Sequence, residues 1–191
     1  MIMDFPAKIN SVLPESLFCK VNEEVASIET EYVFNNGSLQ RSSRFLGQLN
    51  RWDRIIYYKA ATHTLLKVKR VLQKDIRLAK MHSGGKLFGS QPEFHTDFDE
   101  DYLYTFVLFT NLHWNTNWGG EFVVRDPHTE EYKYVPYIPN NGVLVPSNWE
   151  HTGNPPISVD AGLRTSVAFM YCETDRYDEF LLKYPACRLY S

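Results

Sequence analysis

The sequence lacks the features of several common protein classes. It has no apolar run of the ~20 residues that a membrane-spanning helix needs, and its first residues, 1–6, show no basic start followed by an apolar stretch. Only 3 cysteines are present, none in a C-x-x-C pair, which argues against a disulfide framework and against a zinc or redox site built on paired cysteines. We therefore expect a cytoplasmic protein with reduced cysteines and no membrane partner.

Neither sign of charge dominates the sequence. Lys and Arg total 20 against 23 Asp and Glu, a formal net charge of −3, so nucleic acid is not an expected partner. A chain of 191 residues that is 43% hydrophobic can form one domain with a substantial core. We expect a monomer or a small homo-oligomer. The aromatic content of 15% favours β-structure.

Hydrophobic periodicity divides the chain into a helical part and a strand-rich part. Apolar residues three or four apart predict helices at about 15–29 and 50–76, with a loop at 34–49. Short alternating runs later in the chain are typical of antiparallel strands. The predicted strands are 75–82, 92–97, 103–111, 120–125, 131–136, 142–146 and 163–171, and the predicted turns are 126–129 and 139–142.

Seven short strands behind two helices predict a mainly β fold, either a β-sandwich or a jelly roll, with helices on one face. We assign the whole chain to one domain, with helical support at 1–76, a β core at 77–172 and a C-terminal tail at 173–191. Lys and Arg are frequent at the end of the second predicted helix. We interpret them as a solvated face, with an anionic partner as the alternative.

Several catalytic and binding motifs are absent. The sequence has no G-x-S-x-G nucleophile elbow, no G-x-G-x-x-G dinucleotide loop and no phosphate-binding P-loop. Asp97, Asp99 and Asp101 imitate the start of a calcium loop. However, Tyr102 stands where that loop needs glycine, and Leu108 stands where it needs glutamate. The EF-hand interpretation therefore fails.

The triplet His95-Thr96-Asp97 is a candidate metal site. On a strand, side chains two residues apart share a face, so the imidazole and the carboxylate can bind one ion. His151 follows the apolar strand predicted at 142–146 and is the candidate third ligand. Two histidines and one carboxylate leave coordination positions open, which suits non-haem Fe(II) and O₂. A hydrogen-bonded His–Asp pair without a metal is the alternative.

Arg164 and Ser166 form a second candidate group. They follow His151 in the sequence and share one face of the strand predicted at 163–171. A guanidinium beside a hydroxyl in an apolar barrel can anchor a carboxylate, because arginine stays charged and binds carboxylates in a bidentate manner. The pair therefore predicts an anionic ligand.

Taken in this order, these motifs resemble the Fe(II)/2-oxoglutarate-dependent dioxygenases, and within them the prolyl 4-hydroxylase-like branch. The resemblance covers about residues 77–172, and the aspartate in the H-x-D motif separates the chain from the related halogenases, which have a small residue there. The matching motifs are His95-x-Asp97, Tyr104–Asn111, Trp118–Phe122, Pro139–Val145, His151 and Arg164-x-Ser166.

The resemblance implies both a fold and a reaction. The fold is a double-stranded β-helix, a cupin-like jelly roll, braced here by the N-terminal helices. Fe(II) would be held by His95, Asp97 and His151, and no catalytic residue is implied beyond these ligands. The expected activity is hydroxylation of a C–H bond with O₂ and 2-oxoglutarate, which releases succinate and CO₂. Ascorbate is a further candidate cofactor.

The resemblance also implies how 2-oxoglutarate would bind. Arg164 would hold its far carboxylate. Ser166 would supply a hydroxyl, because Phe109 stands where the family often has a tyrosine that bonds the cosubstrate. His82 is a further candidate contact with the cosubstrate or the substrate.

Three hypotheses for the function stay open. The family branch implies a prolyl residue in a peptide or protein as substrate. A free small molecule, such as an amino acid or a metabolite, would use the same iron site. The third hypothesis is a noncatalytic metal-binding jelly roll or a zinc hydrolase, neither of which explains Arg164 and Ser166 well.

Overall fold

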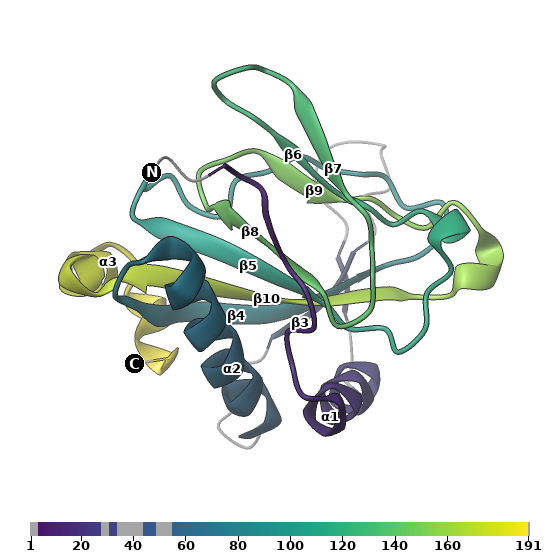
Figure 1. The fold of residues 1–191 in the computed structure, drawn as a ribbon, viewed down its shortest axis with the longest axis horizontal. Coiled ribbons are helices and arrows are strands. Elements are labelled where there is room, and N and C mark those ends of the chain that lie inside the picture. The colour runs from purple at the N-terminus through teal and green to yellow at the C-terminus, as the bar shows by residue number, and fades with distance from the viewer. Residues whose placement is uncertain (1–3, 28–30, 34–43, 49–54, 191) are drawn as a thin grey trace.

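The computed structural model describes residues 4–27, 31–33, 44–48 and 55–190, and it contains a large antiparallel sheet that faces a smaller one (Figure 1). The large sheet has the strand order β1 (Ala7–Ile9), β8 (Gly142–Pro146), β5 (Leu103–Phe109), β10 (Arg164–Glu173), β4 (Ile76–Lys86), β3 (Arg44–Gln48) and β2 (Glu31–Val33). The small sheet has the order β7 (Tyr132–Val135), β6 (Phe122–Arg125) and β9 (His151–Gly153). The fold is the predicted double-stranded β-helix.

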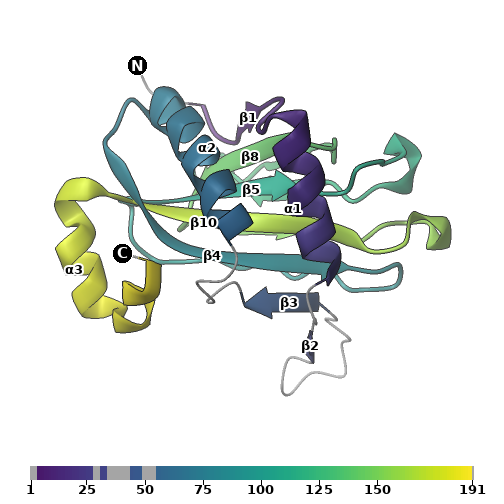
Figure 2. The same cartoon turned by 90° about the horizontal axis from the view of Figure 1, so that it is seen from below.

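Helices cover the outer face of the large sheet. The helices α1 (Glu15–Ser27) and α2 (Ile55–Leu72) lie across this face, and α3 (Tyr177–Lys183) lies at one end (Figure 2). An apolar stripe docks α1 on the sheet, because helical positions three or four apart share a face. None of the described helices is long and apolar enough to cross a membrane. The buried residues of α1 are Phe18, Val21 and Val25.

Strand β5 is buried on both faces, and its side chains divide two cores. Tyr104 and Phe106 pack in the core that contains the helices, whereas Phe109 packs between the two sheets. This division follows from the two-residue period of a strand. Thr105 and Val107 share the inner face with Phe109 and line a cavity between the sheets.

Most of the predicted elements are confirmed to within a few residues. They include both helices, the two turns and six of the seven strands. The strand predicted at 92–97 is the exception. In the turn at 126–129, the carboxylate of Asp126 accepts hydrogen bonds from the amides of His128 (2.9 Å) and Thr129 (3.4 Å). All three cysteines are free thiols, as expected.

The predicted strand at 92–97 is wrong. Only His95 pairs, in an isolated bridge with His151. Pro92 has no amide proton to give to a ladder, and the amide of Asp97 donates to the carbonyl of Ser147 at the end of β8. The segment is therefore a connection between β4 and β5 of the large sheet, and at His95 it contacts β9 of the small sheet.

The predicted loop at 34–49 is also wrong in part, since β3 occupies 44–48. Its other residues, 34–43 and 49, lie outside the part of the chain that the structure describes. The sequence analysis also fails to predict β1, β2, β9 and α3. These elements have 3, 3, 3 and 7 residues, which is too short for a clear period.

Three of the basic residues near the end of α2 have partners within the chain. Lys69 pairs with Asp75 at 2.5 Å, and Lys74 pairs with Glu173. Lys67 donates to the carbonyl of Ser11 at 2.7 Å. These contacts favour a solvated, internally paired face over a site for an anionic partner.

Phe106 tests the contact between the helices and the large sheet, since it is 0% exposed. We expect Phe106→Ala to lower the free energy of unfolding by about 3–5 kcal/mol, because the substitution removes buried area and leaves a cavity. Urea unfolding measures this loss. The control Phe88→Ala removes a residue that is 55% exposed and should cost less than ~1 kcal/mol. Equal losses in the two variants would contradict the packing.

Candidate metal centre

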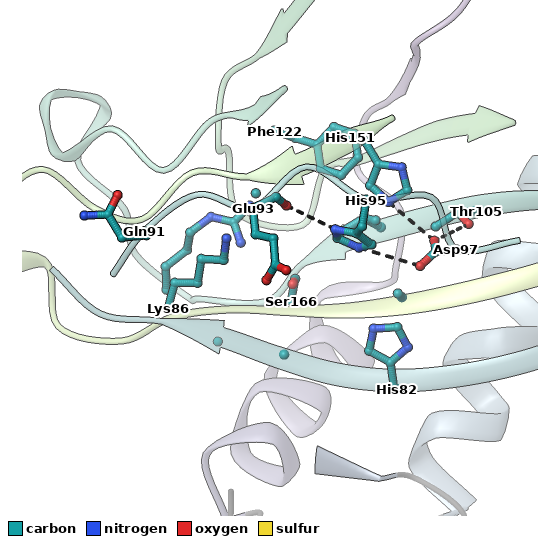
Figure 3. Close-up of a pocket in the computed structure, with 16 residues that line it drawn as sticks. His82, Lys86, Gln91, Glu93, His95, Asp97, Thr105, Phe122, His151 and Ser166 are labelled. Atoms are coloured by element: carbon teal, nitrogen blue, oxygen red, sulfur yellow. Dashed lines mark hydrogen bonds and ion pairs between the residues drawn. The ribbon is translucent and has the colours of Figure 1, made fainter. Parts of the chain in front are cut away.

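Three side chains that can ligate a metal meet between the two sheets (Figure 3). His95 and Asp97 come from the β4–β5 connection, and His151 begins β9. Nε2 of His95 lies 3.8 Å from Oδ1 of Asp97, and Nε2 of His151 lies 3.4 Å from Oδ2. Two ligand atoms each about 2.1 Å from an ion, at right angles, are about 3 Å apart. The cluster is therefore close to an arrangement that holds one ion.

Backbone hydrogen bonds hold the three ligands relative to one another. The amides of His95 and His151 each donate to the carbonyl of the other residue, at 3.1 and 3.0 Å. The amide of Asp97 donates to the carbonyl of Ser147 at 2.9 Å. These bonds tie the β4–β5 connection to the segment between β8 and β9, so ligands from distant parts of the chain arrive together.

The two histidines have the same tautomer. Nδ1 of His95 lies 3.1 Å from the carbonyl oxygen of Glu93, and Nδ1 of His151 lies 2.8 Å from that of Trp149. Because a carbonyl oxygen only accepts hydrogen bonds, Nδ1 carries the proton in both rings. Nε2 of each ring is then the nitrogen that lies near Asp97 and that can ligate a metal when it carries no proton, as is usual for ligating histidines.

The buried carboxylate makes the site attractive to cations. Burial raises the pKa of Asp97, but His151, His82 and the hydroxyl of Thr105 outweigh this effect and hold the pKa well below its usual range. Burial lowers the pKa of His151, and the adjacent carboxylate of Asp97 raises it by more. Asp97 is therefore ionised at neutral pH and stabilises positive charge beside it.

Arg164 is buried in the same cavity. Its Nε donates to the carbonyl of Gly120 at 2.7 Å, and its Cζ lies 4.7 Å from the ring centre of Tyr137 and 5.7 Å from that of Phe109. Burial lowers the pKa of this guanidinium, although arginine stays charged in proteins. Nη2 has no hydrogen-bond partner among the described residues. A buried, unpaired donor on a cation fits an anionic ligand.

Two glycines leave space for this guanidinium. A Cβ on Gly153 would lie 3.0 Å from Nη1 of Arg164, and a Cβ on Gly120 would lie 3.2 Å from its Cδ. Gly120 also has a φ of +84°, which side chains disfavour. The backbone can therefore approach Arg164 closely at both positions.

One cavity of about 100 Å³ brings together all the predicted site residues. Arg164 and Ser166 line it from β10, as their spacing predicts, and His82 lines it from β4. Phe109 is not part of the cavity lining and stacks on Tyr137 at 4.7 Å. The predicted residues in the lining are His82, His95, Asp97, His151, Arg164 and Ser166.

Several other residues of the site are not predicted from the sequence. Phe122 stacks on the His151 ring with centroids 5.3 Å apart, and Thr105 donates a hydrogen bond to Asp97. Thr105 did carry a signal, since it is a hydroxyl within an apolar strand. Lys86 and Glu93 also line the cavity, and no pattern in the sequence singles them out.

Comparisons with known proteins place this fold among oxygenases. No protein-family model matches the chain, and no curated protein matches its sequence. The α-ketoglutarate-dependent epimerase SnoN from nogalamycin biosynthesis superposes with a TM-score of 0.71 at 15% identity, over 89% of this chain and 79% of that one. HygX from Streptomyces hygroscopicus superposes with a TM-score of 0.65 at 12% identity, over 87% of this chain and 82% of that one. A prolyl hydroxylase from Trichoplax adhaerens superposes with a TM-score of 0.67 at 15% identity, over 91% of this chain and 86% of that one.

Structures of all three proteins with ligands are among the matches. SnoN holds Fe³⁺, α-ketoglutarate and nogalamycin RO, HygX holds nickel and 2-oxoglutarate, and the prolyl hydroxylase holds a peptide fragment of a hypoxia-inducible factor. The chain thus has the fold of the 2-oxoglutarate/Fe(II) oxygenases. Prolyl hydroxylases are among the structures that share this fold.

Substituting one ligand tests the metal centre. We expect His151→Ala to weaken the binding of Co(II), a spectroscopic substitute for Fe(II), by more than about 100-fold, because a buried ligand is lost. Equilibrium titration measures this change. His113→Ala is the control, since His113 is exposed and lies outside the cavity lining. Equal affinity in His151→Ala and the control would rule out His151 as a ligand.

Proposed function

We propose that this protein is an Fe(II)- and 2-oxoglutarate-dependent dioxygenase that hydroxylates a C–H bond. The proposal depends on one observation: the buried guanidinium of Arg164 and the His–Asp–His cluster line the same cavity. The cluster alone would also suit a zinc hydrolase. A cluster that shares its cavity with an unpaired cation suits a ligand with a metal-binding group at one end and a carboxylate at the other. 2-Oxoglutarate has this form.

The metal ligands and the cavity wall have separate roles in this proposal. Bound Fe(II) would supply the activation of O₂, coupled to conversion of 2-oxoglutarate to succinate and CO₂. His95, Asp97 and His151 would hold the ion from one side and leave its other positions open. Phe122 and Val107 line the cavity with apolar surface, which limits the entry of water.

The cosubstrate would lie along β10. Arg164 would bind the far carboxylate through its unpaired Nη2 and would transfer no proton, since arginine stays charged in proteins. Ser166 lines the cavity from the same strand, and we assign it a hydrogen bond to that carboxylate. His82 lines the cavity from β4, and we assign it a contact with the cosubstrate or the substrate. Ascorbate would serve as an accessory reductant.

We propose a prolyl residue in a peptide or protein as the substrate. The resemblance to the prolyl 4-hydroxylase-like branch and the peptide bound to the Trichoplax enzyme support this choice. A free small molecule is the second candidate, which the SnoN and HygX complexes with nogalamycin RO and hygromycin B support. The cytoplasmic location and the monomeric or small homo-oligomeric state stay predictions from the sequence.

The role of Arg164 gives a direct test. We expect Arg164→Met to raise the Kd of 2-oxoglutarate for the Fe(II)-loaded protein by about 10- to 100-fold, because a charged hydrogen bond is lost. Anaerobic calorimetry measures the change, and Fe(II) affinity should stay the same. Arg125→Met is the control, because Arg125 forms surface ion pairs with Glu130 and Glu150. An unchanged Kd in Arg164→Met would overturn its role as the anchor.

A hydroxylation screen separates the two substrate classes. The Fe(II)-loaded protein is incubated with 2-oxoglutarate and O₂, and with either proline-rich peptides or a set of free amino acids and metabolites. We expect the mass of one added oxygen in a peptide, in proportion to the succinate formed. Oxygen addition only to small molecules would move the assignment to the second candidate. Succinate formation without oxygen addition in either set would support the chemistry and show that both substrate classes are wrong.

A further inference from the structure

A pair of buried hydroxyls lies directly behind the Asp97 carboxylate. Oγ1 of Thr105 donates to Oδ2 of Asp97 at 2.6 Å (Figure 3). The same Oγ1 lies 2.9 Å from Oγ of Ser147. Thr105 and Ser147 are both 0% exposed. Burying a hydroxyl without a hydrogen bond costs roughly 1–3 kcal/mol. Thr105 is flanked by Tyr104 and Phe106 in a strand of otherwise apolar and aromatic residues, so its polar partners are Asp97 and Ser147.

The direction of the protons in this chain of hydroxyls follows from the bond to the carboxylate. Oδ2 of Asp97 accepts from Oγ1 of Thr105, because a carboxylate oxygen has no proton to donate. Thr105 has one hydroxyl proton, which it gives to Oδ2. The bond between the hydroxyls therefore runs from Ser147 to Thr105. Each donor polarises the next, and this strengthens the final bond to the carboxylate.

Ser147 also holds the main chain of Asp97. Its carbonyl accepts hydrogen bonds from the amides of Asp97 (2.9 Å) and Phe98 (3.3 Å), and its own amide donates to the carbonyl of Leu103 at 2.9 Å. The backbone of Asp97 is therefore anchored to Ser147, and its carboxylate is anchored to Thr105. Both the position and the rotation of the carboxylate are restricted.

We propose that Thr105, supported by Ser147, is a positioning residue that limits Asp97 to a single coordination position on the metal. The inference rests on the proposed metal site. The hydrogen bond from Thr105 occupies a lone pair of Oδ2 and fixes the rotation of the carboxylate, which disfavours binding of both oxygens to one ion. A carboxylate bound through both oxygens would fill a position that 2-oxoglutarate or O₂ needs. The hydroxyl thus keeps that position open and places the carboxylate correctly for the ion.

Three variants at two hydroxyls test this role. Thr105→Val keeps the shape of the side chain and removes the hydroxyl, whereas Thr105→Ser keeps the hydroxyl. Thr64→Val is the matched control, because it removes a buried hydroxyl that bonds Tyr171 in the helix-covered core, away from the cavity. Each protein is titrated with Co(II), whose absorption spectrum reports coordination number, and unfolding in urea is measured in parallel.

We expect Thr105→Val to raise the Kd of Co(II) by about 10- to 100-fold, because loss of a partner that hydrogen-bonds a metal ligand typically weakens binding by that factor. The substitution should also change the Co(II) spectrum. Thr105→Ser should retain the wild-type affinity and spectrum. Thr64→Val should lose stability and keep both metal properties. A wild-type Kd and spectrum in Thr105→Val, or a Thr105→Ser protein that behaves like Thr105→Val, would overturn the positioning role.

Ser147→Ala keeps the test decisive if Thr105→Val does not fold. This variant removes only the hydroxyl that donates to Thr105 and keeps the backbone bonds of residue 147. It should raise the Kd of Co(II) by a smaller factor, about 2- to 10-fold. An unchanged Kd would overturn the support that Ser147 is proposed to give Thr105. Failure of the wild-type protein to bind Co(II) would instead contradict the proposed function, so the two failures are distinguishable.

Discussion

The ionised carboxylate of Asp97, which lies mostly buried between two sheets with 11% of its side chain exposed, is the constraint on which the site depends. A buried charge is costly unless it is paired and hydrogen-bonded. Here the compensation comes from His151 at 3.4 Å, His95 at 3.8 Å and the hydroxyl of Thr105 at 2.6 Å. Removing the carboxylate would leave the hydroxyl of Thr105 without its acceptor and the two imidazoles without the adjacent negative charge. The same attraction that stabilises Asp97 in the fold makes this point of the molecule a cation site.

The covering of the large sheet allows such a site to form. Because α1 and α2 bury its outer face, the strands β5 and β10 are apolar on that side and can carry polar groups on the inner side. Strand β5 supplies Thr105 there, and β10 supplies Arg164 and Ser166. The helices thus stabilise the sheet without entering the site. The chemistry is confined to the cavity between the sheets.

Spacing along the sequence predicts much of the site. Arg164 and Ser166 are two residues apart on one strand, so they share a face, and both side chains line the cavity. For His95 and Asp97 the convergence is correct but the predicted strand is wrong, because hydrogen bonds to residues far along the chain direct these side chains. Thr105 was not predicted, since its partner lies on another element. The short strands β1 and β9 escape prediction because their pairing partners are distant in the sequence.

The central claim is that one cavity holds a metal and 2-oxoglutarate together, and an anaerobic titration tests it most directly. Metal-free protein is loaded with Fe(II) and then with 2-oxoglutarate, while the visible spectrum is recorded. We predict a metal-to-ligand charge-transfer band that appears only after both additions and saturates at one equivalent of each. Iron binding without the band, or no iron binding at all, would contradict this account of the site.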